Sequence, residues 1–284
     1  MSASHPLTEV QIALPNAPVE RLSVALNRSP GVKVVTPLVR ALALIAAFGP
    51  QERWLGNGQL AQRTGLPPST VSRITQSLAS LGYLRYDSVQ RKYRLCAAVL
   101  GLGYPAIAHS AIQRLAAQRM AAFAHQHGLH VCLAVRDRLD LVVLECRRSV
   151  ASTFMLPLHV GMRVGIALSP MGWSLLAALP ELERSYLLEN VERRTPRDWA
   201  RLRRRVLEGI AQVGETGYCT AIGEWEPELG ILAASVLLEG NAPFVLVCIG
   251  ASRVMSRARV ARELGPRLLA MAHELQSEFN AIGH

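Results

Sequence analysis

The chain has 284 residues and half of them are hydrophobic, so a sizeable core is available and a disordered or fibrous protein is excluded. The formal net charge is +10, and residues 31–100 carry most of it, with nine basic and two acidic side chains. A basic segment this concentrated indicates a polyanionic partner, either nucleic acid or an anionic membrane surface.

A membrane location is the weaker alternative. The longest apolar runs, such as 42–48 and 95–102, are much shorter than the ~20 residues that span a bilayer, and residues 1–30 show no secretory signal pattern. The five cysteines are widely spaced and form no Cys-x-x-Cys pair, which argues against a disulfide framework or a structural zinc site. We therefore expect a cytoplasmic protein with reduced thiols, no metal ion and no cofactor.

The N-terminal part predicts a tail followed by three helices. Residues 1–31 predict a flexible tail, because their prolines and polar residues show no periodicity. A first helix is expected from Thr36, as its N-cap, to about Phe48. A short second helix is expected over 58–64, and a third begins at Ser69, which we assign as its N-cap. The third helix has four apolar residues on its expected buried face: Val71, Ile74, Leu78 and Leu81.

Two short strand-like runs, 83–86 and 92–95, flank a polar and basic tip and predict a β-hairpin. A helix, a helix–turn–helix and a hairpin in this order predict a winged helix–turn–helix over residues 32–96. That window coincides with the basic segment, so the charge and the fold pattern both point to DNA.

Residues 97–127 predict a mostly helical connector with a break at Tyr104-Pro105. Residues 128–284 mix strand-like and helical runs and predict an α+β domain with an antiparallel sheet. We expect strands at 130–135, 141–146 and 154–158, and a hairpin that joins 236–238 to 244–249. We expect helices at 169–179, 181–191, 196–213 and 256–282.

The exposed side of the third helix carries the side chains expected to contact DNA, because the second helix of a helix–turn–helix enters the major groove. Arg73 is suited to a bidentate pair with guanine and Gln76 to adenine, whereas hydroxyl groups bind phosphates or bases. The complete expected set is Arg40, Ser69, Thr70, Ser72, Arg73, Gln76, Ser77, Arg91 and Lys92. The alternative is a small helical subdomain with an ordinary solvated face.

Short motifs occur in a fixed order along residues 32–280. The N-terminal ones are Arg40-Ala41-Leu42, Thr64-Gly65-Leu66-Pro67, Ser69-Thr70-Val71 and Leu81-Gly82-Tyr83-Leu84. The C-terminal ones are Gly161-Met162-Arg163-Val164, Gly217-Tyr218, Glu224-Trp225-Glu226-Pro227 and Ala233-Ala234. With this ordered set, the chain resembles the IclR-type transcriptional regulators.

The resemblance implies a homodimeric or tetrameric regulator whose winged helices bind a palindromic operator in double-stranded DNA. It implies that the connector helix joins two subunits and that a GAF-like domain over residues 128–284 holds a small organic effector. Regulators of this type often control catabolic operons, as repressors or activators, and are not enzymes.

Positions that match the polar pocket groups of acid-sensing family members are apolar here. The effector-binding residues implied by the resemblance are Pro170, Met171, Ala221, Leu229, Ile231, Val247 and Ile249, with Trp225 as a candidate wall. Trp173 stands where the family usually has a lysine. A pocket without hydrogen-bond donors holds a small carboxylate poorly, because nothing offsets the desolvation of the charge. We therefore expect an aromatic or otherwise apolar effector, and a role in aromatic catabolism.

Three alternatives stay open for the C-terminal domain. It is a filled core without a ligand, or it serves only oligomerisation in a ligand-independent regulator. The third alternative is an enzyme with a DNA-binding appendage, although no acid–base pair or metal set occurs at the expected pocket positions.

Overall fold

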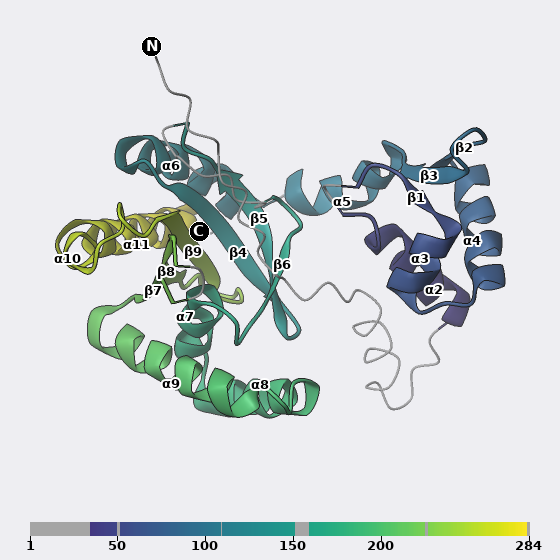
Figure 1. The fold of residues 1–284 in the computed structure, drawn as a ribbon. Coiled ribbons are helices and arrows are strands. Elements are labelled where there is room, and N and C mark those ends of the chain that lie inside the picture. Colours follow the sequence, from purple (N-terminus) through teal and green to yellow (C-terminus); the bar gives the residue numbers. More distant parts are fainter. Residues whose placement is uncertain (1–34, 50–51, 109, 151–158, 225–226, 283–284) are drawn as a thin grey trace, which may run out of the picture. The chain divides into compact units, whose positions relative to one another are not determined.

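The structure is a computed structural model, and it describes residues 35–49, 52–108, 110–150, 159–224 and 227–282. The described residues divide into an N-terminal unit that ends at His109 and a C-terminal unit that begins at Ser110, and each is described by itself (Figure 1). The expected tail and the expected strand at 154–158 lie outside the described residues. No helix within the described ranges is long and apolar enough to cross a membrane.

The N-terminal unit is a winged helix–turn–helix, as the sequence predicts. Its three strands form an antiparallel sheet in the order β1-β3-β2. The elements are α2 (Thr36–Ala46), β1 (Leu55–Gly56), α3 (Asn57–Thr64), α4 (Pro68–Ser80), β2 (Leu84–Asp87), β3 (Lys92–Leu95) and α5 (Ala98–Ala108). One cluster of buried residues joins the helices to the sheet: Leu44, Ala47, Leu55, Leu60, Val71, Leu78, Leu84 and Tyr93.

Two expected details of α4 are wrong. The helix begins at Pro68 with Pro67 in the N-cap position, so the N-cap lies two residues before the expected Ser69; a proline in the first turn needs no backbone partner and is compatible with this earlier start. At the other end, Leu81 is 69% exposed. Thr75 is buried instead, and its hydroxyl donates to the Val71 carbonyl oxygen at 2.9 Å.

The first helix and the connector also differ from expectation. Helix α2 begins at Thr36 itself, with Val35 in the N-cap position. The connector is two helices: α5 ends at Ala108 and α6 covers Ala111–His127. Pro105 lies inside α5, which continues for three residues beyond it, although an interior proline loses one helical hydrogen bond and crowds the preceding turn.

The C-terminal unit is an α+β fold built on one antiparallel sheet. The strand order is β6-β5-β4-β9-β8-β7. The strands are β4 (His130–Asp137), β5 (Asp140–Arg147), β6 (Arg163–Gly165), β7 (Cys219–Ile222), β8 (Leu229–Val236) and β9 (Phe244–Ala251). The helices after α6 are α7 (Pro170–Ala178), α8 (Glu181–Arg194), α9 (Trp199–Thr216), α10 (Arg257–Arg259), the π-turn η1 (Val260–Leu264) and α11 (Gly265–Ile282).

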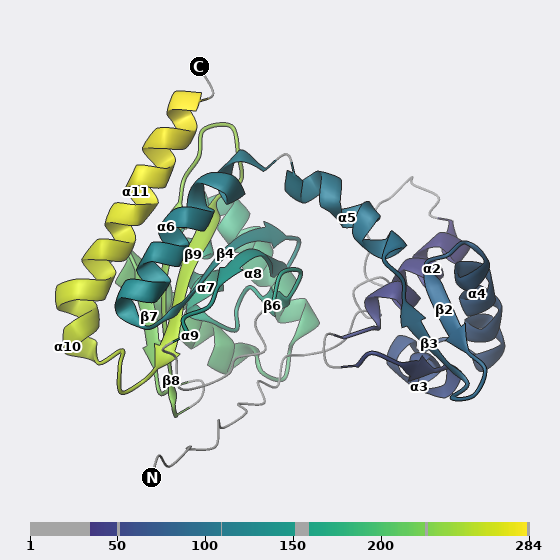
Figure 2. The ribbon, with the colours of Figure 1, turned by 90° about the horizontal axis from the view of Figure 1, so that it is seen from above.

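Helices cover both faces of this sheet. Helices α6 and α11 lie on one face (Figure 2), over a cluster that includes Val131, Leu232, Leu246 and Cys248. Helix α7 packs on the opposite face against β7, β8 and β9. Because side chains alternate along a strand, the strand residues next to those of the first cluster point toward α7. This α7 face includes Cys132, Cys146, Cys219, Ala221, Leu229, Ile231, Ala233, Ser235, Val247 and Ile249.

The first strand of the hairpin that was expected to join 236–238 to 244–249 is placed wrongly. Strand β8 ends at Val236, where the expected arm begins, and it pairs with β9 along its whole length. Strands β6 and β7 were not expected either. Strand β8 is buried on both faces, so its sequence lacks the polar alternation of a half-exposed strand, and Gly230 and an alanine pair weaken its strand propensity.

A buried carboxylate ties two elements to the tight turn between β4 and β5. The side chain of Asp140 is 3% exposed, and Arg163 of β6 and Arg194 of α8 approach it at 3.4 and 3.3 Å. A charge buried to this extent is stable only when it is paired, so the two arginines fix β6 and α8 against the sheet.

Candidate nucleic-acid interface and effector face

One side of α4 is free of the core and carries polar side chains. Arg73, Gln76, Ser69 and Ser77 are exposed there, whereas Thr70 and Ser72 are partly exposed. The Ser77 hydroxyl donates to the Arg73 carbonyl oxygen at 3.0 Å, so its oxygen remains as an acceptor.

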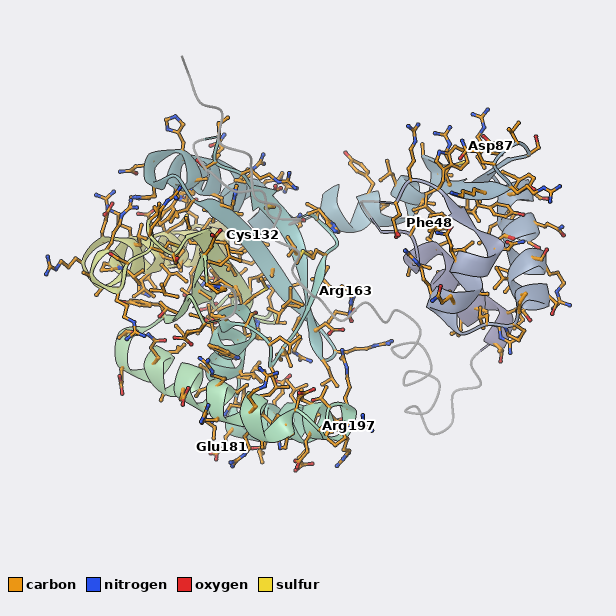
Figure 3. The ribbon with its side chains drawn as sticks, in the orientation of Figure 1. Phe48, Asp87, Cys132, Arg163, Glu181 and Arg197 are labelled. Atoms are coloured by element: carbon orange, nitrogen blue, oxygen red, sulfur yellow. The ribbon has the colours of Figure 1, made fainter. Side chains whose placement is uncertain are left out.

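The hairpin tip is shaped by one aspartate. The Asp87 Oδ1 atom accepts hydrogen bonds from the backbone N–H groups of Val89 and Gln90, both at 2.9 Å, and Figure 3 labels this residue at the end of the hairpin. The following Arg91 is exposed and has a φ of +53°, a conformation that a non-glycine residue adopts only when its surroundings hold it there. The tip therefore presents Arg91 and the partly exposed Lys92 on an ordered turn.

Most cations of the N-terminal unit have no carboxylate partner. Among the described residues of this unit, the one ion pair joins Arg63 to Glu52. Arg63 also donates to the Ala47 carbonyl oxygen at 3.0 Å. Arg63 is thereby committed to holding α3 against the end of α2. Arg40, on α2, and Arg73, Arg91 and Lys92 form no ion pair with any described residue.

Sequence reasoning missed two further cations of this kind. Arg53 precedes β1, Arg85 lies on β2, and both are exposed. Their charge was visible in the sequence, but their exposure depends on how the strands turn. Arg94, across the hairpin from Arg85, instead lies with its guanidinium 5.3 Å from the centre of the Trp54 ring.

The expected effector residues gather on the α7 face. Ala221, Ile231 and Ile249 lie side by side across β7, β8 and β9 in one register row. Val247 of β9 lies two residues before Ile249, and Leu229 of β8 lies two residues before Ile231, so the two flank this row on opposite sides. Pro170 and Met171 begin α7. All seven are buried. Trp225 lies outside the described residues.

This face also has polar groups that the family positions did not reveal. The Ser169 hydroxyl, directly before Pro170, is buried and has no hydrogen-bond partner among the described residues. Ser174 and Ser235 form a hydroxyl pair at 2.9 Å, and the Cys219 thiol donates to the Pro170 carbonyl oxygen at 3.1 Å. The expectation of a face without hydrogen-bonding groups is therefore wrong, and the Ser169 hydroxyl is a buried group there whose hydrogen-bonding capacity is unused among the described residues.

Trp173 has a packing role. Its indole Nε1 donates to the Ala167 carbonyl oxygen at 3.0 Å, and its ring lies against Gly209 of α9, where an added Cβ would approach the ring to 2.6 Å. The tryptophan thus joins α7 to α9.

A hollow of about 440 Å³ lies between α9, β7, α10 and the π-turn η1. Its lining mixes apolar side chains with polar ones such as Arg205, Gln212 and Arg257, and among the described residues it includes none of those expected to bind the effector. In the described part of the chain, no group of three or more His, Cys, Asp or Glu side chains is arranged to hold a metal ion.

Two family models match successive parts of the chain. The IclR helix-turn-helix domain matches residues 37–88, and the bacterial transcriptional regulator IclR C-terminal domain matches residues 105–277. The chain belongs to the IclR family of transcriptional regulators. Members of the IclR family regulate transcription and are not enzymes, so the enzyme alternative is excluded.

The IclR-family chain is similar over most of its length to individual members. It is 30% identical to the HTH-type transcriptional regulator TsaQ1/TsaQ2 of Comamonas testosteroni, over 88% of this chain and 91% of that one. An IclR family transcriptional regulator from Brucella abortus has a TM-score of 0.75 and 34% identity, over 87% of this chain and 93% of that one. An IclR homolog from Microbacterium hydrocarbonoxydans, complexed with 4-hydroxybenzoate, has the same fold, with a TM-score of 0.66 and 21% identity over 86% of this chain and 99% of that one.

Proposed function

We propose that this IclR-family regulator binds a palindromic operator as a homodimer or tetramer, under the control of a small aromatic or apolar effector. The observation that carries the DNA half of the proposal is the outer side of α4, where Arg73 and Gln76 are exposed and Arg73 forms no ion pair with any described residue. The DNA that it binds lies in the cytoplasm, and the genes under its control belong to a catabolic operon.

Each DNA-facing side chain has a role that follows from its chemistry and place. Arg73 and Gln76 read base edges in the major groove, where arginine pairs with guanine and glutamine with adenine. The hydroxyls of Ser69, Thr70, Ser72 and Ser77 bind phosphates or bases. Arg40 from α2 and Arg91 and Lys92 from the hairpin tip contact phosphates, and we add Arg53 and Arg85 to this group because both are exposed.

The proposed effector site is the α7 face beside the first turn of α7. Pro170, Met171, Ala221, Leu229, Ile231, Val247 and Ile249 supply the apolar surface, with Trp225 as a wall. The Ser169 hydroxyl offers a polar contact, since it is buried and has no hydrogen-bond partner among the described residues. An aromatic ring with one polar substituent matches this combination. The 4-hydroxybenzoate complex of the Microbacterium hydrocarbonoxydans protein supports an aromatic ligand and makes 4-hydroxybenzoate the first compound to test.

Regulation follows from a shift between conformations. An effector that binds one arrangement of the subunits more tightly than another changes the separation of the two recognition helices relative to the operator half-sites. The size of the effect is set by the differential affinity of the effector for the two arrangements, so a tight ligand with equal affinity for both would leave DNA binding unchanged.

The test is fluorescence anisotropy of the full-length protein on its own upstream intergenic DNA, at two salt concentrations, with scrambled DNA of equal length as the control. We expect specific binding that weakens steeply with salt, because neutralised phosphates release counterions. Equal affinity for scrambled DNA would refute the operator proposal.

The effector half is tested by adding 4-hydroxybenzoate and, separately, pyruvate to the same titration. We expect only the aromatic acid to change the operator affinity. The Val247→Thr variant, which adds a hydroxyl to the proposed apolar surface at nearly constant volume, should weaken that response, whereas Val160→Thr at an exposed position should not. Specific operator binding that no compound shifts would favour the ligand-independent alternative.

A further inference from the structure

Two cysteine thiols lie against each other on neighbouring strands of the C-terminal sheet. Cys132 of β4 is directly opposite Cys146 of β5, and their Sγ atoms are 3.0 Å apart (Cys132 is labelled in Figure 3). Both are free thiols, and the S–S distance of a disulfide is about 2.05 Å, so the two sulfur atoms need to approach by only about 1 Å to bond.

The two thiols have different surroundings. Cys132 is fully buried, and its contact with Cys146 together with burial raises the pKa of its thiol. Cys146 is partly exposed, and the hydrogen bond from Cys132, assisted by the nearby Arg148 guanidinium, lowers the pKa of its thiol. The pair therefore combines an accessible sulfur that ionises more readily with a buried partner that stays protonated and can donate to it.

We propose that Cys132 and Cys146 form a peroxide-sensitive dithiol, a modification site that converts reversibly to an intramolecular disulfide. The Cys146 thiolate attacks a hydroperoxide; an S–O bond forms, the O–O bond breaks, and the alcohol or water leaves after protonation. The Cys132 sulfur then attacks the Cys146 sulfenic acid while its proton passes to the departing hydroxide, so the S–S bond forms, the S–O bond breaks and water leaves. Overall, two thiols lose two electrons and two protons, and the peroxide is reduced to alcohol or water, plus one further water.

The other described cysteines do not share this chemistry. Cys219 and Cys248 are buried, and burial raises the pKa of both thiols. Cys248 pairs with Val131 and points to the face covered by α6 and α11, away from the dithiol. Cys96 is partly exposed but belongs to the N-terminal unit, so it serves as a matched control cysteine.

The site lies on the α7 face. Cys132 is in register with Val247, which carries part of the proposed effector surface. A disulfide would pull β4 and β5 together next to that surface. The oxidation itself follows from the sheet geometry alone and does not depend on the proposed operator or effector, so either proposal can fail without the other.

The experiment treats the reduced full-length protein with hydrogen peroxide, blocks the remaining thiols with an alkylating agent and maps the products by mass spectrometry. We expect a loss of two hydrogen atoms, a cross-linked peptide pair containing Cys132 and Cys146, and full reversal by dithiothreitol. The measurement uses the wild-type chain and so does not rely on a variant that folds. Retention of both thiols, or a cross-link that involves a different pair, would overturn the proposal.

Two variants then assign the roles. In Cys132→Ala, we expect no disulfide but a Cys146 sulfenic acid that dimedone traps. In Cys96→Ser, we expect disulfide formation at the wild-type rate. The Cys146→Ala variant tests the opposite assignment. If dimedone labels Cys132 in this variant, and the variant reacts with peroxide as fast as the wild type, the proposed mechanism is refuted.

Discussion

Replacing Gly172 by alanine should destabilise the C-terminal unit, although alanine is the better helix former. A Cβ at residue 172 would lie 1.8 Å from the Ile166 carbonyl oxygen and 2.5 Å from its carbonyl carbon. These are backbone atoms, which cannot rotate away as a flexible side chain can. Helix α7 would have to move away from the segment before it, and Pro170 and Met171 would move with it.

The two opposing contributions have different sizes. Alanine is worth about 0.5–1 kcal/mol over glycine inside a helix, whereas overpacking costs about 1–3 kcal/mol and more where backbone must move. We therefore expect the free energy of unfolding to fall by about 2 kcal/mol. Gly214→Ala in α9 is the matched control, because an added Cβ there meets nothing within 4 Å. The control should gain about 0.5–1 kcal/mol.

Urea unfolding followed by far-UV circular dichroism and by tryptophan fluorescence measures both changes. The two probes should report the same order of stability: Gly214→Ala above the wild type, and Gly172→Ala below it. A Gly172→Ala protein as stable as the wild type would show that α7 has room to shift without loss of packing. In that case the close approach of α7 to Ile166 would not be what positions Pro170 and Met171.

Three further predictions concern DNA binding, a buried charge and pH. Arg73→Ala should weaken operator binding by about 1–3 kcal/mol and relax one base preference, while Arg203→Ala on α9 should have no effect; an equal loss on all sequences would make Arg73 a phosphate contact only. Asp140→Ala should lower the free energy of unfolding by about 2–3 kcal/mol, less than for a fully buried pair because its two arginines are partly exposed; a loss below about 0.5 kcal/mol in urea unfolding would contradict this. Burial lowers the pKa of His127 and outweighs the attraction of Glu263. The folded state therefore binds a proton at His127 less readily than the unfolded state does. The contribution of the neutral His127 to the free energy of unfolding should be lost as the pH falls below 6.5. The stability difference between pH 7.5 and pH 5.5 should therefore be smaller in His127→Gln than in the wild type, and equal differences would show that His127 does not contribute.

The sequence alone was sufficient for the winged helix–turn–helix and for the family. The glycine at 65 ends α3 in a left-handed conformation, the spacing of Val71 and Leu78 defines the inner side of α4, and a polar tip separates two short strands. These signals are local: each depends on a turn, a cap or a helical repeat within about ten residues. The same locality limits them, since Leu81 continues the apolar spacing of α4 but comes after the helix ends and is exposed.

Only the tertiary structure decided the composition of the α7 face. Strand β8 is buried on both sides by helices far away in the sequence, so its pattern carries no alternation from which a strand could be predicted. The unused Ser169 hydroxyl is recognisable only once burial and partners are known. Cys132 and Cys146 are 14 residues apart in the sequence, and it is the register of β4 against β5, with its bulge after Leu133, that places one thiol opposite the other. Register is a property of paired strands, and a single strand read from sequence does not contain it.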